Sequence, residues 1–150
     1  MGLKARRFPP ILQFSLFRFD IDYSNFSRFK VNDRFEFPLE IDMKPYLIAD
    51  SEQINDDLQY ELKQVIIHIG SAHGGHYKTY IRDDMGEKPW NPPPLKEPLQ
   101  PFPIPPSNPD LLQNWFEFND SVVKPIYGET IAEQFGDGKN SSSAYILIYQ

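Results

Sequence analysis

The sequence predicts a β-dominated α+β fold built around an antiparallel sheet. Its 150 residues are 40% hydrophobic and 15% aromatic, which is enough apolar material for one domain with a core. Apolar, β-branched and aromatic runs of strand length are separated by turn residues, and no rhythm of strands alternating with long helices is present. Without such helical crossovers, neighbouring strands are expected to run antiparallel.

Six segments are expected to be extended. In chain order they are residues 11–19, 33–38, 60–69, 76–82, 114–119 and 144–149. Two prolines open the first segment, Pro38 ends the second and Gly70 ends the third, and each of these residues is typical of a strand boundary.

Helical structure is expected only in one or two short pieces. Residues 42–46 suit a single helical turn, and residues 129–135 carry a short helical pattern that Gly136 closes. The polar segments 20–30 and 50–57 lack a clear hydrophobic period, so both are predicted to be loops.

Residues 83–113 form a proline-rich segment that differs from the rest of the chain. Ten of the fifteen prolines lie between Pro89 and Pro109. Proline removes amide donors and favours polyproline II, so this segment cannot extend a sheet and is expected to be an exposed, mobile insertion at a hairpin tip. An alternative is that it binds an SH3-like or WW-like domain as a proline motif.

Composition excludes several classes of function. The net charge is −6 and no basic stripe is present, which argues against nucleic-acid binding. No apolar run is long enough to span a membrane, and residues 1–7 lack the apolar centre of a signal peptide. The chain has no cysteine, which excludes disulfides, and a cytoplasmic or nuclear location is expected.

Two short motifs carry chemistry. His76 follows the glycine pair Gly74 and Gly75 at the start of one extended segment, and Asn119 and Asp120 end another. An imidazole and a side-chain amide or carboxylate are two of the three groups of a Cys-His-Asn/Asp hydrolase. The third group, a cysteine, is missing, so the chain contains half of such an active site.

The two motifs are expected to meet across a hairpin. A register with His76 opposite Asn119 also sets Lys78 opposite Glu117, an opposite-charge pair on the same face. The other face is then apolar and is expected to be buried; it carries Tyr77, Thr79, Phe116 and Phe118. Side chains alternate along a strand, so a slip of one residue would lose both matches.

Other interpretations of these residues remain open. His76 alone could be an ordinary surface histidine, and Asp120 could either supply charge to the imidazole or cap a turn. His68 and His73 together with His76 offer only a weak zinc site, because they spread over a strand and a glycine loop. His68 is more simply a structural strand residue, and Trp115 and Tyr80 are expected to pack. No cofactor or metal is expected.

The order of several segments resembles the ubiquitin-specific protease family. The segments that carry this resemblance are residues 9–19, 30–38, 60–68, 74–77, 115–120 and 143–149, and together they cover nearly the whole chain. The resemblance implies a papain-like thumb, palm and fingers fold that cleaves isopeptide bonds after the ubiquitin C-terminus. It identifies residues 1–150 with the C-terminal half of the catalytic domain, mostly the sheet of the palm.

The resemblance also assigns roles to residues. It implies that His76 is the general base, that Asn119 is the third member of the triad, and that Asp120 is a supporting acidic neighbour. Residues 71–75 resemble one loop bordering the channel for the ubiquitin tail, and residues 20–30 resemble the other. The candidate substrate-binding residues are Ser71, Ala72, His73, Gly74, Gly75 and Tyr77.

The chain departs from the family in what it lacks. The family's cysteine motif, oxyanion donor and zinc-binding fingers all lie N-terminal to the matched segments, so this chain alone is expected to be inactive. The implied partners are ubiquitin, ubiquitinated proteins and the missing N-terminal half of the catalytic domain. The alternative is a non-catalytic ubiquitin-binding or scaffold module derived from such a protease.

Overall fold

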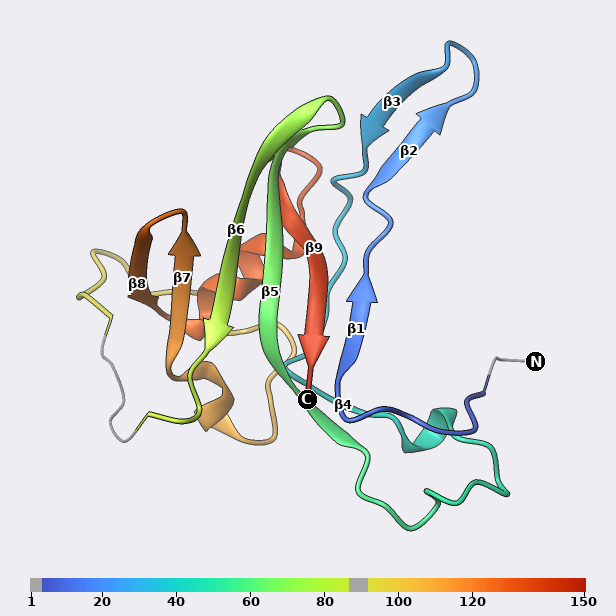
Figure 1. The fold of residues 1–150 in the computed structure, drawn as a ribbon. Helices are drawn as coiled ribbons and strands as arrows, with labels where there is room; N and C mark the ends of the chain where they lie inside the picture. The colour runs from blue at the N-terminus through green and yellow to red at the C-terminus, as the bar shows by residue number, and fades with distance from the viewer. Residues whose placement is uncertain (1–3, 87–91) are drawn as a thin grey trace.

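The computed structural model describes residues 4–86 and 92–150, and its main feature is a seven-stranded antiparallel sheet (Figure 1). The strand order is β1-β9-β5-β6-β7-β8, and β4 also pairs with β5. The strands are β1 (Leu12–Ser15), β4 (Glu40–Asp42), β5 (Gln59–Ser71), β6 (Gly74–Arg82), β7 (Trp115–Asn119), β8 (Val122–Ile126) and β9 (Ser142–Tyr149). The predicted β-dominated antiparallel fold is confirmed.

The centre of the sheet is β5, which lies between β6 and β9. Its β-branched run favours an extended backbone, and Val65 and Ile67 are fully buried. The same face of β9 contributes Leu147 and Tyr149 to the core. Strand β5 is therefore the rigid support from which the β5–β6 hairpin projects at one end of the sheet (Figure 1).

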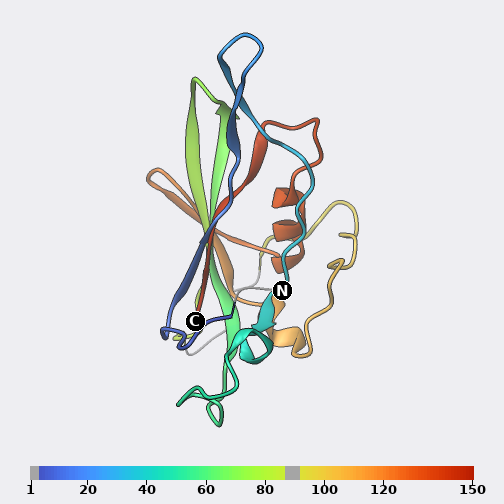
Figure 2. The ribbon, with the colours of Figure 1, turned by 90° about the vertical axis from the view of Figure 1, so that its right-hand side faces the viewer.

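Three short 3-10 helices occur in the described part of the chain: η1 (Lys44–Tyr46), η2 (Pro109–Leu112) and η3 (Gly128–Phe135). The last one confirms the helical pattern predicted for residues 129–135. It buries Ile131 and Phe135 completely and ends where Gly136 adopts a φ of 87°, a conformation that favours glycine. Figure 2 shows η3 and the proline-rich segment on the same side of the sheet.

The prediction of one strand over residues 11–19 is wrong. Strand β1 ends at Ser15, and the chain leaves the main sheet before β2 (Phe19–Asp22) begins. Arg18 lies at this break and is only 4% exposed. Its guanidinium donates to the carbonyl oxygens of Asp33 at 2.5 Å, Phe135 at 3.0 Å, Ala144 at 3.2 Å and Val31 at 3.3 Å. A buried cation in the middle of an aromatic run therefore interrupts the strand.

The loop predicted for residues 20–30 is instead a β-hairpin. Strand β2 pairs with β3 (Ser27–Lys30) in a separate two-stranded sheet that extends beyond β1 (Figure 1). The turn is closed by the Asp22 side chain, which accepts hydrogen bonds from Ser24 and Asn25. The sequence contains this turn signal, but the aromatic residues around it mask the alternation of a strand.

Three other predictions need correction. Strands β4 and β8 were not expected, and Pro125 in β8 is tolerated because β8 is an edge strand. Residues 33–38 are extended as predicted but belong to no sheet. They are held instead by contacts such as the hydrogen bond from Phe35 N to Phe135 O at 2.8 Å.

The proline-rich segment joins β6 to β7 and is exposed only in part. The structure describes residues 83–86 and 92–113 of this segment, and residues 93–98 are exposed as expected. The prediction for residues 87–91 lies outside the described residues. Farther along, Phe102 is only 4% exposed, and its ring contacts that of Phe135 edge-on with centroids 5.6 Å apart. Ser107 then donates to the Glu40 carboxylate through its backbone N and through Oγ, which lies 2.8 Å away. Residues 102–107 therefore form a strap, a segment that packs across η3, and not a solvated loop.

We expect Phe102→Ala to lower the free energy of unfolding by roughly 3 kcal/mol, because a buried aromatic ring is lost against η3. Leu95→Ala, in the exposed part of the same segment, is the matched control and should change stability by less than about 0.5 kcal/mol. Urea unfolding followed by circular dichroism measures both. Equal effects of the two substitutions would contradict the strap.

Among the described residues no helix is long and apolar enough to cross a membrane.

Candidate active site

His76 lies near the start of β6, directly after a tight connection from β5. Gly70 pairs with Gly75 and Ser71 pairs with Gly74, which leaves a two-residue turn at Ala72 and His73. Gly70 has a φ of 132°, and a Cβ atom there would lie 2.6 Å from the carbonyl oxygen of Gly74. The glycines therefore let the backbones of β5 and β6 approach closely at the turn. This tight turn places His76 near the start of β6.

The structure brings the side chains of His76 and Asn119 together. The imidazole Nε2 lies 2.6 Å from Asn119 Oδ1, although the two residues are 43 positions apart in the sequence. An amide oxygen only accepts hydrogen bonds, so Nε2 donates and Nδ1 keeps a free lone pair. The imidazole is thus held in one tautomer with its other nitrogen available to take a proton.

Asp120 lies beside this pair in a more open position. Its Oδ2 atom is 3.9 Å from His76 Nε2, and its side chain is 79% exposed. Asp120 also has a φ of 52° in the two-residue turn between β7 and β8, a conformation that Asp tolerates well. Its structural role in the turn is therefore clear from the backbone.

The hairpin register differs from the predicted one by two residues. Thr79 pairs with Phe118 and Tyr80 pairs with Glu117, so continuing this ladder places Lys78, not His76, opposite Asn119. His76 reaches Asn119 diagonally. A slip of two residues keeps every side chain on its predicted face, so hydrophobic alternation cannot distinguish the two registers.

The predicted buried face of this hairpin is also wrong. Tyr77 is 51% exposed and Phe118 is 39% exposed, whereas Tyr80 and Trp115 are buried on the face that carries His76. Helix η3 covers that face, and Gln134 Nε2 lies 3.4 Å from Tyr80 OH. Both faces of the hairpin carry aromatic residues, so only the position of η3 decides which face is covered. Trp115 and Tyr80 are both buried in the core, but Trp115 pairs with Arg82 and does not face Tyr80 as expected.

Lys78 and Glu117 form the predicted ion pair and sit next to the His76–Asn119 contact. Lys78 Nζ lies 3.0 Å from Glu117 Oε2, and Lys124 Nζ from β8, which the sequence did not suggest, lies 2.9 Å from Oε1. Burial raises the pKa of Glu117, but hydrogen bonds from Lys124 and Lys78 outweigh burial and bring the pKa below its usual value. Burial lowers the pKa of Lys78, but the bond to Glu117 and the nearby Tyr80 raise it overall.

The lowered pKa of Glu117 makes this ion pair sensitive to acid. Its stabilisation is present above the ordinary pKa of 4.5 and is lost as the pH falls through the lower folded pKa. We expect Glu117→Gln to cost about 1–2 kcal/mol near pH 7 and progressively less below pH 4.5. Urea titrations between pH 3 and 7 measure this. Glu36→Gln, at the exposed ion pair with Arg34, is the surface control.

The candidate substrate-binding residues do not all share one face. Tyr77 lies on the side opposite His76, with its ring centroid 5.0 Å from that of His68. Ala72 lines a hollow of about 360 Å³ together with Phe19, Asp20, Ile21 and Arg28 of the β2–β3 hairpin. The structure thus brings the two loops predicted to border one channel, residues 71–75 and 20–30, to the same hollow.

The weak zinc alternative is not supported by the positions of the histidines. His68 and Ile69 point to opposite faces of β5, and His76 pairs with Ile69, so His68 and His76 lie on opposite sides of the sheet. No group of three potential metal ligands occurs within residues 4–86 and 92–150. His68 is buried against Phe19 and Tyr77, as expected for a structural residue.

Lys30 is a partly buried cation that sequence reasoning missed. Its Nζ donates to the carbonyl oxygen of His68 at 2.8 Å and to that of Ser141, which ties the base of the β2–β3 hairpin to the main sheet. Burial and the nearby charge of Arg18 lower the pKa of Lys30 to about 8. A lysine between two hydrophobic residues gives no sequence signal for such a contact.

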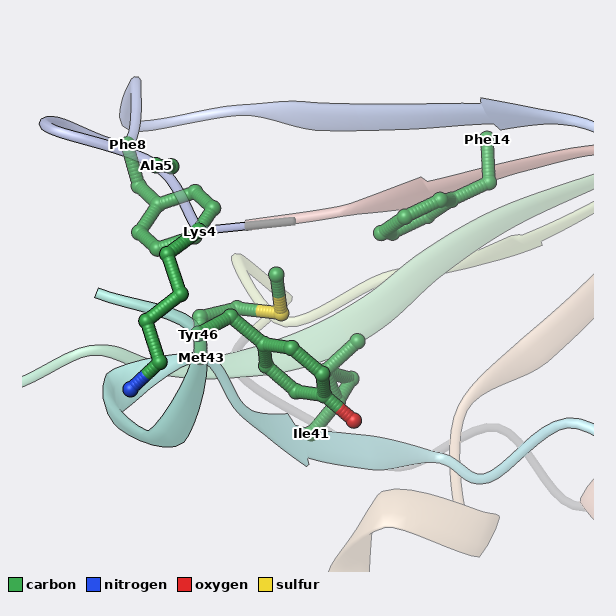
Figure 3. A pocket seen from close by; sticks show the side chains of 7 residues that line it. All are labelled: Lys4, Ala5, Phe8, Phe14, Ile41, Met43 and Tyr46. Carbon is green, nitrogen blue, oxygen red and sulfur yellow. The ribbon is translucent and has the colours of Figure 1, made fainter. Parts of the chain in front are cut away.

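A second hollow, of about 480 Å³, lies far from His76 (Figure 3). It is formed between the N-terminal segment, β1 and the region of β4 and η1, and is lined by Lys4, Ala5, Phe8, Phe14, Ile41, Met43 and Tyr46. None of these residues is a candidate site residue. The chemistry-bearing groups are at the opposite end of the sheet.

Comparison with known proteins places the chain in a family. The family model described as ubiquitin carboxyl-terminal hydrolase matches residues 2–149. Ubiquitin C-terminal hydrolase 12 of Arabidopsis thaliana is 34% identical over 165 residues, covering 95% of this chain and 12% of that relative. Ubiquitin carboxyl-terminal hydrolase 15 of Schizosaccharomyces pombe is 30% identical over 162 residues, covering 99% of this chain and 12% of that relative.

Solved structures give the same result. The yeast SAGA DUB module and a SAGA DUB module bound to monoubiquitin each match with a TM-score of 0.60 and 27% identity, covering 95% of this chain and 23% of theirs. The chain thus spans a small part of the proteins it matches, and its sheet has the papain-like fold of this class of protease. The chain belongs to the ubiquitin carboxyl-terminal hydrolase family.

Proposed function

We propose that this chain is the histidine-bearing half of a cysteine-type deubiquitinase that cleaves isopeptide bonds after the ubiquitin C-terminus. The observation that carries the proposal is the 2.6 Å contact between His76 Nε2 and Asn119 Oδ1. Membership of the family and the similarity to a module bound to monoubiquitin support ubiquitin as the substrate.

The proposed chemistry follows from this contact. Asn119 holds the imidazole with Nδ1 free, and Nδ1 removes the proton from a cysteine thiol that another segment supplies. The thiolate attacks the carbonyl carbon of the isopeptide bond, and the imidazolium then protonates the departing amine. Asn119 orients the ring without supplying charge, and the Asp120 carboxylate lies 3.9 Å from the same ring nitrogen.

The hollow beside Ala72 is the proposed entrance for the ubiquitin tail. It lies between the turn before His76 and the β2–β3 hairpin, and a tail of two glycines needs close approach to backbone on both sides. Residues 71–75 and Tyr77 are the proposed substrate contacts on one side. Residues 20–30 of the β2–β3 hairpin border the other side, and the N-terminal half of the catalytic domain is a further proposed partner.

We expect the isolated chain to show no hydrolase activity, because it has no cysteine and cannot form an acyl-enzyme. The measurement is hydrolysis of a ubiquitin–fluorophore conjugate. A chimera tests the proposal itself: the chain replaces the matching segment of the Arabidopsis relative, whose own N-terminal portion supplies the rest. The chimera should hydrolyse the conjugate. A folded but inactive chimera would reject the proposed function.

The second candidate function is a non-catalytic ubiquitin-binding or scaffold module. The absence of cysteine from the chain is the observation that favours it. Titration of the isolated chain with ubiquitin, followed by nuclear magnetic resonance, tests binding without catalysis. Binding by the chain combined with an inactive chimera would favour the module. The exposed prolines at residues 93–98 are the proposed contact for a proline-binding domain in either case.

A further inference from the structure

Lys78 is placed where its ammonium could donate to Asn119 Oδ1, the same oxygen that accepts the hydrogen bond from His76 Nε2. Continuing the β6–β7 ladder sets Lys78 directly opposite Asn119, with side-chain roots about 5 Å apart. A lysine side chain easily spans this distance, and its ammonium carries only donors. Asn119 Oδ1 is therefore within reach of two donors, the Lys78 ammonium and the His76 Nε2–H group.

In the structure the Lys78 ammonium is turned away from Asn119. It pairs with Glu117 at 3.0 Å and lies over the Tyr80 ring, 5.2 Å from the centroid. His76 and Lys78 thus lean in the same direction along the hairpin. His76 reaches Asn119, and Lys78 reaches the next residue on that face, Glu117.

Glu117 is itself fixed firmly enough to hold Lys78. It is buried, and its second carboxylate oxygen accepts from Lys124 at 2.9 Å, so both oxygens are occupied. The lowered pKa of Glu117 and the raised pKa of Lys78 agree with a pair that stays ionised at neutral pH. Lys78 and Lys124 bind different oxygens of this carboxylate, so either contact can be removed while the other is kept.

We propose that Glu117 is a positioning residue that keeps the Lys78 ammonium off Asn119 Oδ1, so that this oxygen remains free to orient His76. The proposal rests on the proposed function, because orientation of His76 matters for catalysis only if His76 is the base. Glu117 acts through Lys78 and Asn119 and touches no reacting atom.

The test compares Glu117→Ala with the double variant Glu117→Ala/Lys78→Met. Without Glu117, the ammonium moves to Asn119 Oδ1 and His76 loses its preferred tautomer. Removing the ammonium as well, by Lys78→Met, should restore the Nε2–H tautomer of His76. Methionine can pack against Tyr80 but donates no hydrogen bond. Lys124→Met is the matched control, because it removes a cation from Glu117 but leaves the Lys78–Glu117 pair.

The first readout needs no catalysis. Two-bond nitrogen–proton correlation spectra of the chain itself report which His76 nitrogen carries the proton. We expect the Nε2–H form in the unsubstituted chain, a mixture of tautomers in Glu117→Ala, and the Nε2–H form again in the double variant. This result stands or falls independently of whether the chimera is active.

The second readout is turnover in the chimera. Glu117→Ala should lower kcat about 10- to 100-fold with little change in KM, because the base is misplaced but the ubiquitin contacts are intact. The double variant should regain most of kcat, and the Lys124→Met control should stay near the unsubstituted value.

Two outcomes would overturn the proposal. One is an unchanged His76 tautomer in Glu117→Ala, and the other is a folded double variant that is as impaired as the single one. Glu117→Gln keeps the packing and one acceptor for Lys78 if the alanine variant does not fold, and it should give a smaller effect in the same direction. A restored tautomer in an inactive chimera would reject the proposed function and leave the role of Glu117 standing.

Discussion

Replacing Arg18 with methionine is expected to lower the free energy of unfolding by roughly 3–5 kcal/mol. The guanidinium is buried and donates to four carbonyl oxygens on separate segments, those of Val31, Asp33, Phe135 and Ala144. Methionine fills a similar space but donates nothing. Buried carbonyls then lose their donor, at a cost comparable to much of the stability of a domain, roughly 5–15 kcal/mol.

Arg18→Lys is the informative partner variant. Lysine keeps the positive charge but has one compact donor group, so it cannot reach carbonyls in several directions as the planar guanidinium does. Urea unfolding should therefore give a loss between zero and that of Arg18→Met. If both variants are as stable as the unsubstituted chain, Arg18 does not join β1, residues 31–33, η3 and β9 as we infer.

His76→Ala in the chimera is expected to reduce kcat by at least about 1,000-fold, because the proposed function assigns removal of the thiol proton to His76. Asn119→Ala should cost less, about 10- to 100-fold, since Asp120 lies 3.9 Å from the imidazole and partly replaces Asn119 as its hydrogen-bond partner. The variants Asn119→Ala and Asp120→Ala together should approach the loss seen for His76→Ala.

Ubiquitin–fluorophore hydrolysis under saturating substrate gives kcat for each variant. Leu95→Ala is the control, because Leu95 is exposed in the proline-rich segment and is not among the proposed ubiquitin contacts. If Leu95→Ala and His76→Ala have the same effect, the imidazole of His76 has no special role. If neither His76→Ala nor Asn119→Ala affects turnover, the assignment of both residues is wrong.

The proximity of His76 and Asn119 was predictable from the sequence for a simple reason. Side chains alternate along a strand, so a register shifted by any even number of residues keeps His76 and Asn119 on the same face of the hairpin. The sequence did not predict the actual shift of two residues, which makes their contact diagonal. The Lys78–Glu117 pair was predictable for the same reason. Its second cation, Lys124, was not, because β8 was not expected as a strand.

The corrections share a different cause. The strap residue Phe102, the break at Arg18 and the anchor at Lys30 all depend on partners far away in the sequence. Local composition correctly marks prolines as unsuitable for a ladder, but it does not say that Phe102 packs on Phe135. An aromatic run likewise does not reveal that Arg18 will turn inward.

Local sequence patterns account for the fold class, the long strands, the helical pattern before Gly136 and the placement of the His76 and Asn119 motifs on one face. These depend on turn residues and on alternation, which act over a few neighbouring positions. Contacts between distant segments determine which face of the β6–β7 hairpin is covered, the exact register, and where the buried Arg18 and the partly buried Lys30 find acceptors. Both faces of the hairpin carry aromatic residues, so the choice between them depends on where η3 packs, and this is a property of the whole chain.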